Sequence, residues 1–130
     1  MDQFAVGFGK KDHAIFLNCD TLEYENVPLV LNDCSLIITN TNKRRGLTDS
    51  KYNERRAECD KAVELLQAYK PIRNLSELST DELPVLEKHI NDTLVIRRAK
   101  HVITENGRVL EAVKALKENN LTRFGELMNL

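Results

Sequence analysis

Residues 35–56 read SLIITNTNKRRGLTDSKYNERR, and within this stretch the sequence changes from strand-like to helix-like, which decides the fold class. The stretch begins with a short apolar run that predicts a central strand over residues 36–39. Polar residues and a basic turn follow, and a helix is predicted to begin at Asp49 or Ser50. A strand end with polar side chains next to a helix N-terminus can bind an anionic or hydroxylated ligand.

Length and charge restrict the class of protein. The chain has 130 residues, the size of one domain or of part of one. Its 19 Lys and Arg nearly balance its 20 Asp and Glu, so we expect no binding to nucleic acid or to an anionic membrane. No apolar run approaches the roughly 20 residues that cross a bilayer. The start, Met1 to Gln3, lacks the basic region of a signal peptide.

The cysteines indicate the cellular compartment. The chain has three, which are Cys19, Cys34 and Cys59. An odd number without metal-ligand spacing predicts free thiols in a reducing environment. We therefore expect a cytoplasmic protein without a metal site, in which the cysteines are buried as small apolar side chains.

Residues 1–48 are predicted to be rich in strands. An apolar run at residues 14–17 and an alternating run at 22–25 are separated by turn-forming residues, which predicts a hairpin. The run at 27–31 contains Pro28, and is therefore expected to be an edge strand or a strand end. With the central strand, the sequence predicts short antiparallel strands between about residues 14 and 39.

Residues 49–130 are predicted to be helical, which makes the chain a single partial domain of the α+β class over residues 1–130. The predicted helices cover about residues 50–69, 80–89, 92–118 and 121–128. Pro71 follows the end of the first helix, and Ser79 with Glu82 forms a capping box before the second. Gly107 is expected to weaken the third helix by about 1 kcal/mol.

Several segments, in this order and at similar spacing, resemble the galactokinases, a branch of the GHMP family of sugar and metabolite kinases. They are Met1 to Phe4, Gly9 to Ala14, Thr39 to Asn42, Asp49 to Arg56, Arg97 to Val102, Arg108 to Ala112 and Leu121 to Met128. The resemblance extends over essentially the whole chain and implies part of a GHMP-kinase fold.

The resemblance implies an enzyme that transfers a phosphoryl group from ATP, with Mg²⁺, to α-D-galactose and forms galactose 1-phosphate. Asp2 would contact the sugar and act as catalytic base, because the reacting hydroxyl must lose its proton. Tyr52 would contact galactose through its ring and its hydroxyl. Arg44, in the basic turn, is a weaker candidate for contacting the nucleotide or the transferred phosphate.

Other motifs of the family are absent. Nothing matches its glycine- and serine-rich phosphate loop, its Arg-x-Asn-x-Ile-Gly-Glu-His segment or its C-terminal glycine-rich motif, and the five glycines do not cluster. We therefore expect an internal piece of a galactokinase that begins at the Met-Asp-Gln motif. We expect this piece to have no kinase activity by itself, to bind no ATP or Mg²⁺, and to self-associate through exposed strand edges and apolar faces.

Alternative interpretations remain open at this point. A galactokinase-like protein that senses a sugar and binds a regulatory partner without catalysis would keep both Asp2 and Tyr52. Another GHMP kinase with a different substrate is less favoured, because the segment around Tyr52 matches the galactokinases. Without the resemblance, Asp2 would be a solvated terminal residue, Tyr52 a half-buried helix residue and Arg44 part of a solvated turn.

Overall fold

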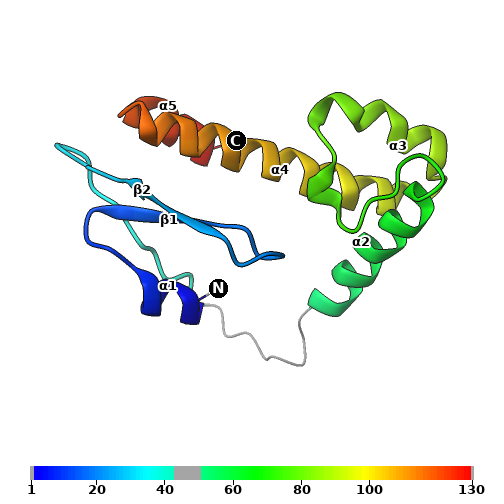
Figure 1. The fold of residues 1–130 in the computed structure, drawn as a ribbon, viewed down its shortest axis with the longest axis horizontal. Helices are drawn as coiled ribbons and strands as arrows, with labels where there is room; N and C mark the ends of the chain where they lie inside the picture. The colour runs from blue at the N-terminus through cyan, green and yellow to red at the C-terminus, as the bar shows by residue number, and fades with distance from the viewer. Residues whose placement is uncertain (1, 43–50, 130) are drawn as a thin grey trace. The chain divides into compact units, whose positions relative to one another are not determined.

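The computed structural model describes residues 2–42 and 51–129, and within these ranges it confirms the α+β class (Figure 1). The elements are α1 (Asp2–Phe8), β1 (His13–Leu17), β2 (Tyr24–Pro28), α2 (Tyr52–Leu66), the 3-10 helices η2 (Leu75–Glu77) and η3 (Thr80–Glu82), α3 (Leu83–His89), α4 (Thr93–Lys117) and α5 (Leu121–Met128).

The chain divides into two compact units. The first comprises Met1–Thr39 and Val109–Leu130, and the second comprises Asn40–Arg108. The prediction of a single partial domain stays a prediction.

The sheet of the first unit is the antiparallel hairpin that the sequence predicts. β1 pairs with β2, so that His13 lies opposite Pro28 and Leu17 lies opposite Tyr24. Asn18 closes the turn between them, because its side-chain oxygen accepts a hydrogen bond from the backbone N–H of Asp20 at 3.0 Å. The hairpin is tied to α4 by Lys117, whose Nζ donates to a carboxylate oxygen of Glu25 at 2.8 Å.

Two strand predictions need correction. The second hairpin strand covers 24–28 rather than 22–25, because Leu22 has a φ of 62° and still belongs to the turn. Pro28 is the last residue of this strand, where its missing N–H is tolerated. The predicted central strand at 36–39 is not formed, since no strand in the described ranges pairs with it. The helix α1 was not predicted from the sequence.

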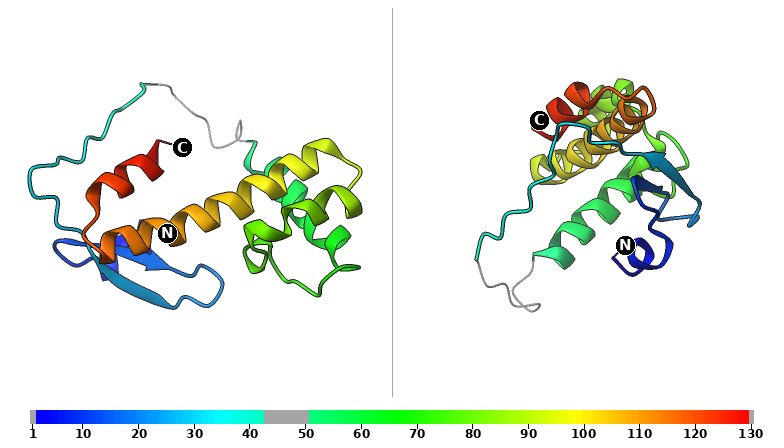
Figure 2. Two further views of the ribbon diagram at one scale, coloured as in Figure 1. Left: turned by 90° about the horizontal axis from the view of Figure 1, so that it is seen from above. Right: turned by 90° about the vertical axis from the view of Figure 1, so that its left-hand side faces the viewer.

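The second unit contains the larger apolar core of the two. This unit contains α2, α3 and the first part of α4, which Figure 2 draws in green to yellow. Its buried residues come from these helices and the segments between them, and they are Ala62, Leu66, Ile72, Leu75, Leu78, Leu86, Ile90, Val95, Ala99 and Ile103. Burial of each large side chain contributes about 1.5–3 kcal/mol. Arg98 also connects α4 to α2, because its Nε lies 2.5 Å from the carboxylate of Glu58.

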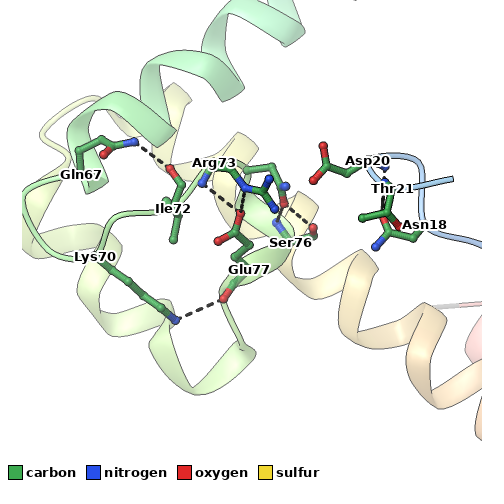
Figure 3. Close-up of polar contacts among 10 residues, drawn as sticks. Asn18, Asp20, Thr21, Gln67, Lys70, Ile72, Arg73, Ser76 and Glu77 are labelled. Carbon is green, nitrogen blue, oxygen red and sulfur yellow. Dashed lines mark hydrogen bonds and ion pairs between the residues drawn. The ribbon is translucent and has the colours of Figure 1, made fainter. Parts of the chain in front are cut away.

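Polar contacts fix the loop that follows α2 (Figure 3). The Nε2 of Gln67 donates to the carbonyl of Ile72 at 2.7 Å. Glu77 is held from two directions, since its Oε1 accepts from the backbone N–H of Arg73 at 3.0 Å and its carbonyl accepts from Nζ of Lys70 at 3.3 Å. These contacts use side chains to satisfy backbone groups that a loop leaves without partners.

Local capping sets the boundaries of the helices that follow. The capping box is confirmed, since the backbone N–H of Ser79 donates to Glu82 Oε2 at 2.9 Å. Asp92 lies directly before α4, and its Oδ1 accepts from the backbone N–H of Leu94 at 3.0 Å. The predicted ends of α3 at His89 and of α5 at Met128 are also confirmed. Each cap satisfies a helix N–H that has no partner within the helix.

Truncation of the fully buried Leu86 is expected to lower the free energy of unfolding by about 2–5 kcal/mol, because the Leu86→Ala change removes packed methyl groups and leaves a cavity. Urea unfolding followed by circular dichroism measures the loss. Leu94→Ala is the matched control, since Leu94 on α4 is 39% exposed and its truncation should cost clearly less. Equal losses for the two variants would contradict the described core.

Glu82→Gln is expected to reduce the loss of stability at acid pH. The pKa of Glu82 lies below its ordinary value, chiefly because the carboxylate accepts a hydrogen bond from the backbone N–H of Ser79. A second hydrogen bond, from Nζ of Lys70, lowers the pKa further. A carboxyl group with a lower pKa in the folded state stabilises the fold above the unfolded pKa, about 4.3 for Glu. This stabilisation disappears as the pH falls through the folded pKa.

Urea midpoints measured between pH 6 and pH 3 test this expectation. The wild-type midpoint should fall more steeply with acid than that of Glu82→Gln, which keeps an oxygen that can accept from Ser79. The control is Glu64→Gln, because Glu64 is exposed and has no ion pair with a described residue. If the urea midpoint of Glu82→Gln fell with acid as steeply as that of the wild type, the proposed link between the Glu82 pKa and stability would be wrong.

Candidate functional site

Asp2 is the first residue of α1, in the first unit, and its side chain is exposed. Aromatic contacts hold this short helix in place: the rings of Phe4 and Phe8 stack with centroids 4.5 Å apart, and Tyr24 of β2 lies 5.2 Å from Phe4 and 5.4 Å from Phe8. Such pairs each contribute about 0.5–1.5 kcal/mol beyond their burial. No ion pair or hydrogen bond joins the Asp2 carboxylate to another described residue. The carboxylate is therefore accessible to a ligand.

Tyr52 is the first residue of α2, in the second unit, and is 67% exposed. The alternative interpretation of a half-buried helix residue is therefore wrong, and the ring and hydroxyl are accessible. Arg56 lies one turn later and makes an ion pair with Asp60, at 3.0 Å from Nε to Oδ1. The pKa of Arg56 is raised, mainly by the hydrogen bond to Asp60 and to a smaller extent by Tyr52. The first turns of α2 therefore present the guanidinium of Arg56 at the surface, where the ion pair with Asp60 fixes its position.

The sequence-predicted site residues are distributed over both units. Asp2 belongs to the first unit and Tyr52 to the second, so their convergence on one sugar stays a prediction. Arg44 lies outside the described residues. Four positions earlier in the sequence, the side-chain oxygen of Asn40 accepts a hydrogen bond from the backbone N–H of Asn42 at 2.8 Å, which stabilises a local turn.

Neither a metal-donor cluster nor a membrane-spanning helix is found among the described residues. In residues 2–42 and 51–129, no group of three or more His, Cys, Asp and Glu side chains could hold a metal ion. No helix in the same ranges is long and apolar enough to cross a membrane. Cys19 and Cys34 are exposed free thiols, which corrects the expectation of buried cysteines.

One small cavity, of about 290 Å³, lies in the first unit. It is lined by Pro28, Val30, Leu116, Lys117, Asn119 and Leu121. Four of these six side chains are apolar and none is acidic, and neither Asp2 nor Tyr52 is among them. The cavity therefore offers no base or sugar contact of the predicted kind.

Comparison with known proteins gives one consistent result. No protein-family model matches the chain. It is 57% identical over 129 residues to the galactokinase of Clostridium perfringens, and the match covers 99% of this chain and 33% of that protein. The galactokinase of Halalkalibacterium halodurans is 55% identical over 129 residues, with 98% and 33% covered. The chain thus spans about a third of the length of the curated relatives that it matches.

A solved structure matches equally well. It is the crystal structure of Lactococcus lactis galactokinase complexed with galactose, with a TM-score of 0.90 and 49% identity over 98% of this chain and 33% of the other. Identity at this level and agreement of the whole described fold support common ancestry. The chain is therefore a member of the galactokinase family, and it corresponds to about one third of the length of these enzymes.

Proposed function

We propose that this chain supplies the catalytic base and a sugar contact of a galactokinase, which phosphorylates α-D-galactose with MgATP to give galactose 1-phosphate and ADP. The observation that carries the proposal is the 57% identity to a galactokinase over 129 residues. The fold match to a galactokinase complexed with galactose supports the choice of sugar. Self-association of the chain stays a prediction.

Asp2 is proposed to accept the proton of the reacting hydroxyl. The hydroxyl oxygen attacks the γ-phosphorus of ATP, the bond between the γ-phosphorus and the bridging oxygen breaks, and the hydroxyl proton passes to the carboxylate. The exposure of Asp2 and the absence of a described cationic partner support this role, because a carboxylate fixed in an ion pair would be a poorer base. General base catalysis contributes about 10²–10⁴-fold to the rate.

Tyr52 and Arg44 are proposed to bind the two substrates. The exposed phenol of Tyr52 has an apolar ring face for the C–H surface of a sugar and a hydroxyl for hydrogen bonding. Arg44 is proposed, with less support, to contact the nucleotide or the transferred phosphate, since a guanidinium binds phosphate oxygens in a bidentate manner. When bound, ATP would supply the phosphoryl group, and its Mg²⁺ would neutralise charge on the phosphate oxygens.

The chain alone is proposed to be inactive. Phosphate groups are commonly held by clustered glycine backbone N–H groups, and the five glycines of this chain are spread from Gly7 to Gly125. This spacing of the glycines supports the view that the nucleotide is bound by parts of a galactokinase that this chain does not contain.

A coupled assay of ADP release tests the inactivity. The isolated chain, supplied with galactose and MgATP, is expected to give no turnover above that of a buffer blank. A chimera in which the chain replaces the 129 aligned residues of the Clostridium perfringens galactokinase is the positive control, and should phosphorylate galactose. Galactose-dependent turnover by the isolated chain would contradict the proposal.

Asp2→Asn in the same chimera is expected to lower kcat by about 100- to 10,000-fold, because the amide cannot accept the hydroxyl proton at neutral pH. The KM for galactose should change little, since the shape of the side chain is kept. Asp33→Asn is the matched control, as Asp33 is also exposed and follows the hairpin. A kcat equal to that of the unmodified chimera would remove Asp2 as the base.

A further inference from the structure

The start of α2, which carries Tyr52, lies outside the core of the second unit. Residues 51–57 are all exposed, and the first buried residue of the helix is Ala62. Lys51, at the N-cap, makes no capping hydrogen bond through its side chain. Helix ends fray, and their first N–H groups have no partner within the helix. A contact that fixes the position of Tyr52 must therefore come from another element.

The ion pair of Glu58 and Arg98 is such a contact. Arg98 on α4 places its Nε 2.5 Å from Oε2 of Glu58, which lies six residues after Tyr52 on α2. The side chains are only 18% and 23% exposed, so salt and solvent screen their attraction less than that of a surface pair. Among the described residues, no other hydrogen bond between α2 and another helix lies as close to Tyr52 in the sequence.

Other polar contacts of α2 are less suited to this task. The ion pair of Arg56 with Asp60 lies within α2, and so it does not set the direction of the helix relative to α4. Lys61 donates to Asp92, just before α4, at 3.2 Å, but both of these side chains are exposed. Exposed pairs contribute little to stability. The pair of Glu58 and Arg98 is therefore the strongest polar connection near the start of the helix.

We propose that Glu58 and Arg98 are a positioning pair, which fixes the first two turns of α2 and so places Tyr52 for contact with galactose. The inference rests on the sugar contact of Tyr52 in the proposed function. Arg98 belongs to the segment Arg97 to Val102, which resembles the galactokinases but has no role in that proposal. Neither member of the pair needs to touch the sugar, because each acts through the helix that carries Tyr52.

Steady-state kinetics of the chimera with Arg98→Met test the pair. Met keeps an apolar stem at this position but lacks the charge. The KM for galactose should rise by about 10- to 100-fold, because a misplaced Tyr52 binds the sugar less well. The kcat should change by less than about threefold, as expected when binding common to the ground state and the transition state is lost.

Two further variants separate positioning from a purely structural role. Lys100→Met is the matched control on α4, because Lys100 pairs with Glu87 of α3 at 2.6 Å, and it should leave the KM unchanged. Arg98→Lys keeps a cationic nitrogen for Glu58 and should keep the KM within about threefold. A purely structural role would lower the fraction of folded enzyme, and so the apparent kcat, at an unchanged KM. That result, or an equal rise in KM for Lys100→Met, would overturn the inference.

Combination with Tyr52→Ala shows whether the pair acts through Tyr52. Tyr52→Ala should itself raise the KM for galactose, and adding Arg98→Met should then change it by less than about twofold, because effects that pass through one contact are not additive. A full further rise would overturn the inference and leave Tyr52 as a sugar contact. An unchanged KM for Tyr52→Ala alone would overturn the sugar contact of the proposed function, and the inference with it.

Hydrogen exchange of the isolated chain gives a readout that needs no activity. The amides of residues 56–58 close the first turns of α2, and in Arg98→Met they should exchange about 10-fold faster than in the wild type. Residues 62–66 of the same helix lie in the core and should exchange at the same rate in both proteins. Unchanged exchange at 56–58, or equally faster exchange in both segments, would overturn the inference.

Discussion

Burial of one apolar face of α4 is the interaction on which the described fold depends. Val95, Ala99 and Ile103 lie four residues apart on this helix and are buried in the second unit. Further along the same helix, Ala115 and Leu116 are buried in the first unit. The continuous helix of 25 residues therefore contributes to both cores. In proteins, packing of an apolar face stabilises a helix more than propensity does, so these two buried stretches are what stabilise α4.

The predictions that succeeded rest on local signals. The capping box of Ser79 and Glu82 lies within four residues of sequence, and its geometry depends little on the rest of the chain. The same holds for α5, whose start is capped by Asn120 through the backbone N–H of Arg123 at 3.0 Å. Helices of this kind can be recognised because neighbouring residues determine the spacing of the apolar side chains, the N-cap and the residue at which the helix ends.

The predictions that failed depend on distant partners or on unusual backbone angles. Leu22 adopts a left-handed conformation that leucine rarely takes, and this shifts the start of β2. The helix α1 is stabilised by contacts with Tyr24, which lies sixteen positions after the last residue of the helix. The seven residues of α1 therefore do not predict a helix by themselves. Asp2 and Tyr52 were found only through the family resemblance, since an exposed acid and a tyrosine carry no catalytic signal by themselves.

The two halves of the proposed site differ in what supports them. Tyr52 lies on α2, which is anchored in a core of ten buried apolar residues within the second unit. Asp2 lies on a seven-residue helix that buries none of its residues and contacts a two-stranded sheet. An isolated two-stranded sheet is at best marginally stable, and its stability increases when further strands and an apolar face are added. The proposed base is therefore held by fewer buried contacts within this chain than the proposed sugar contact.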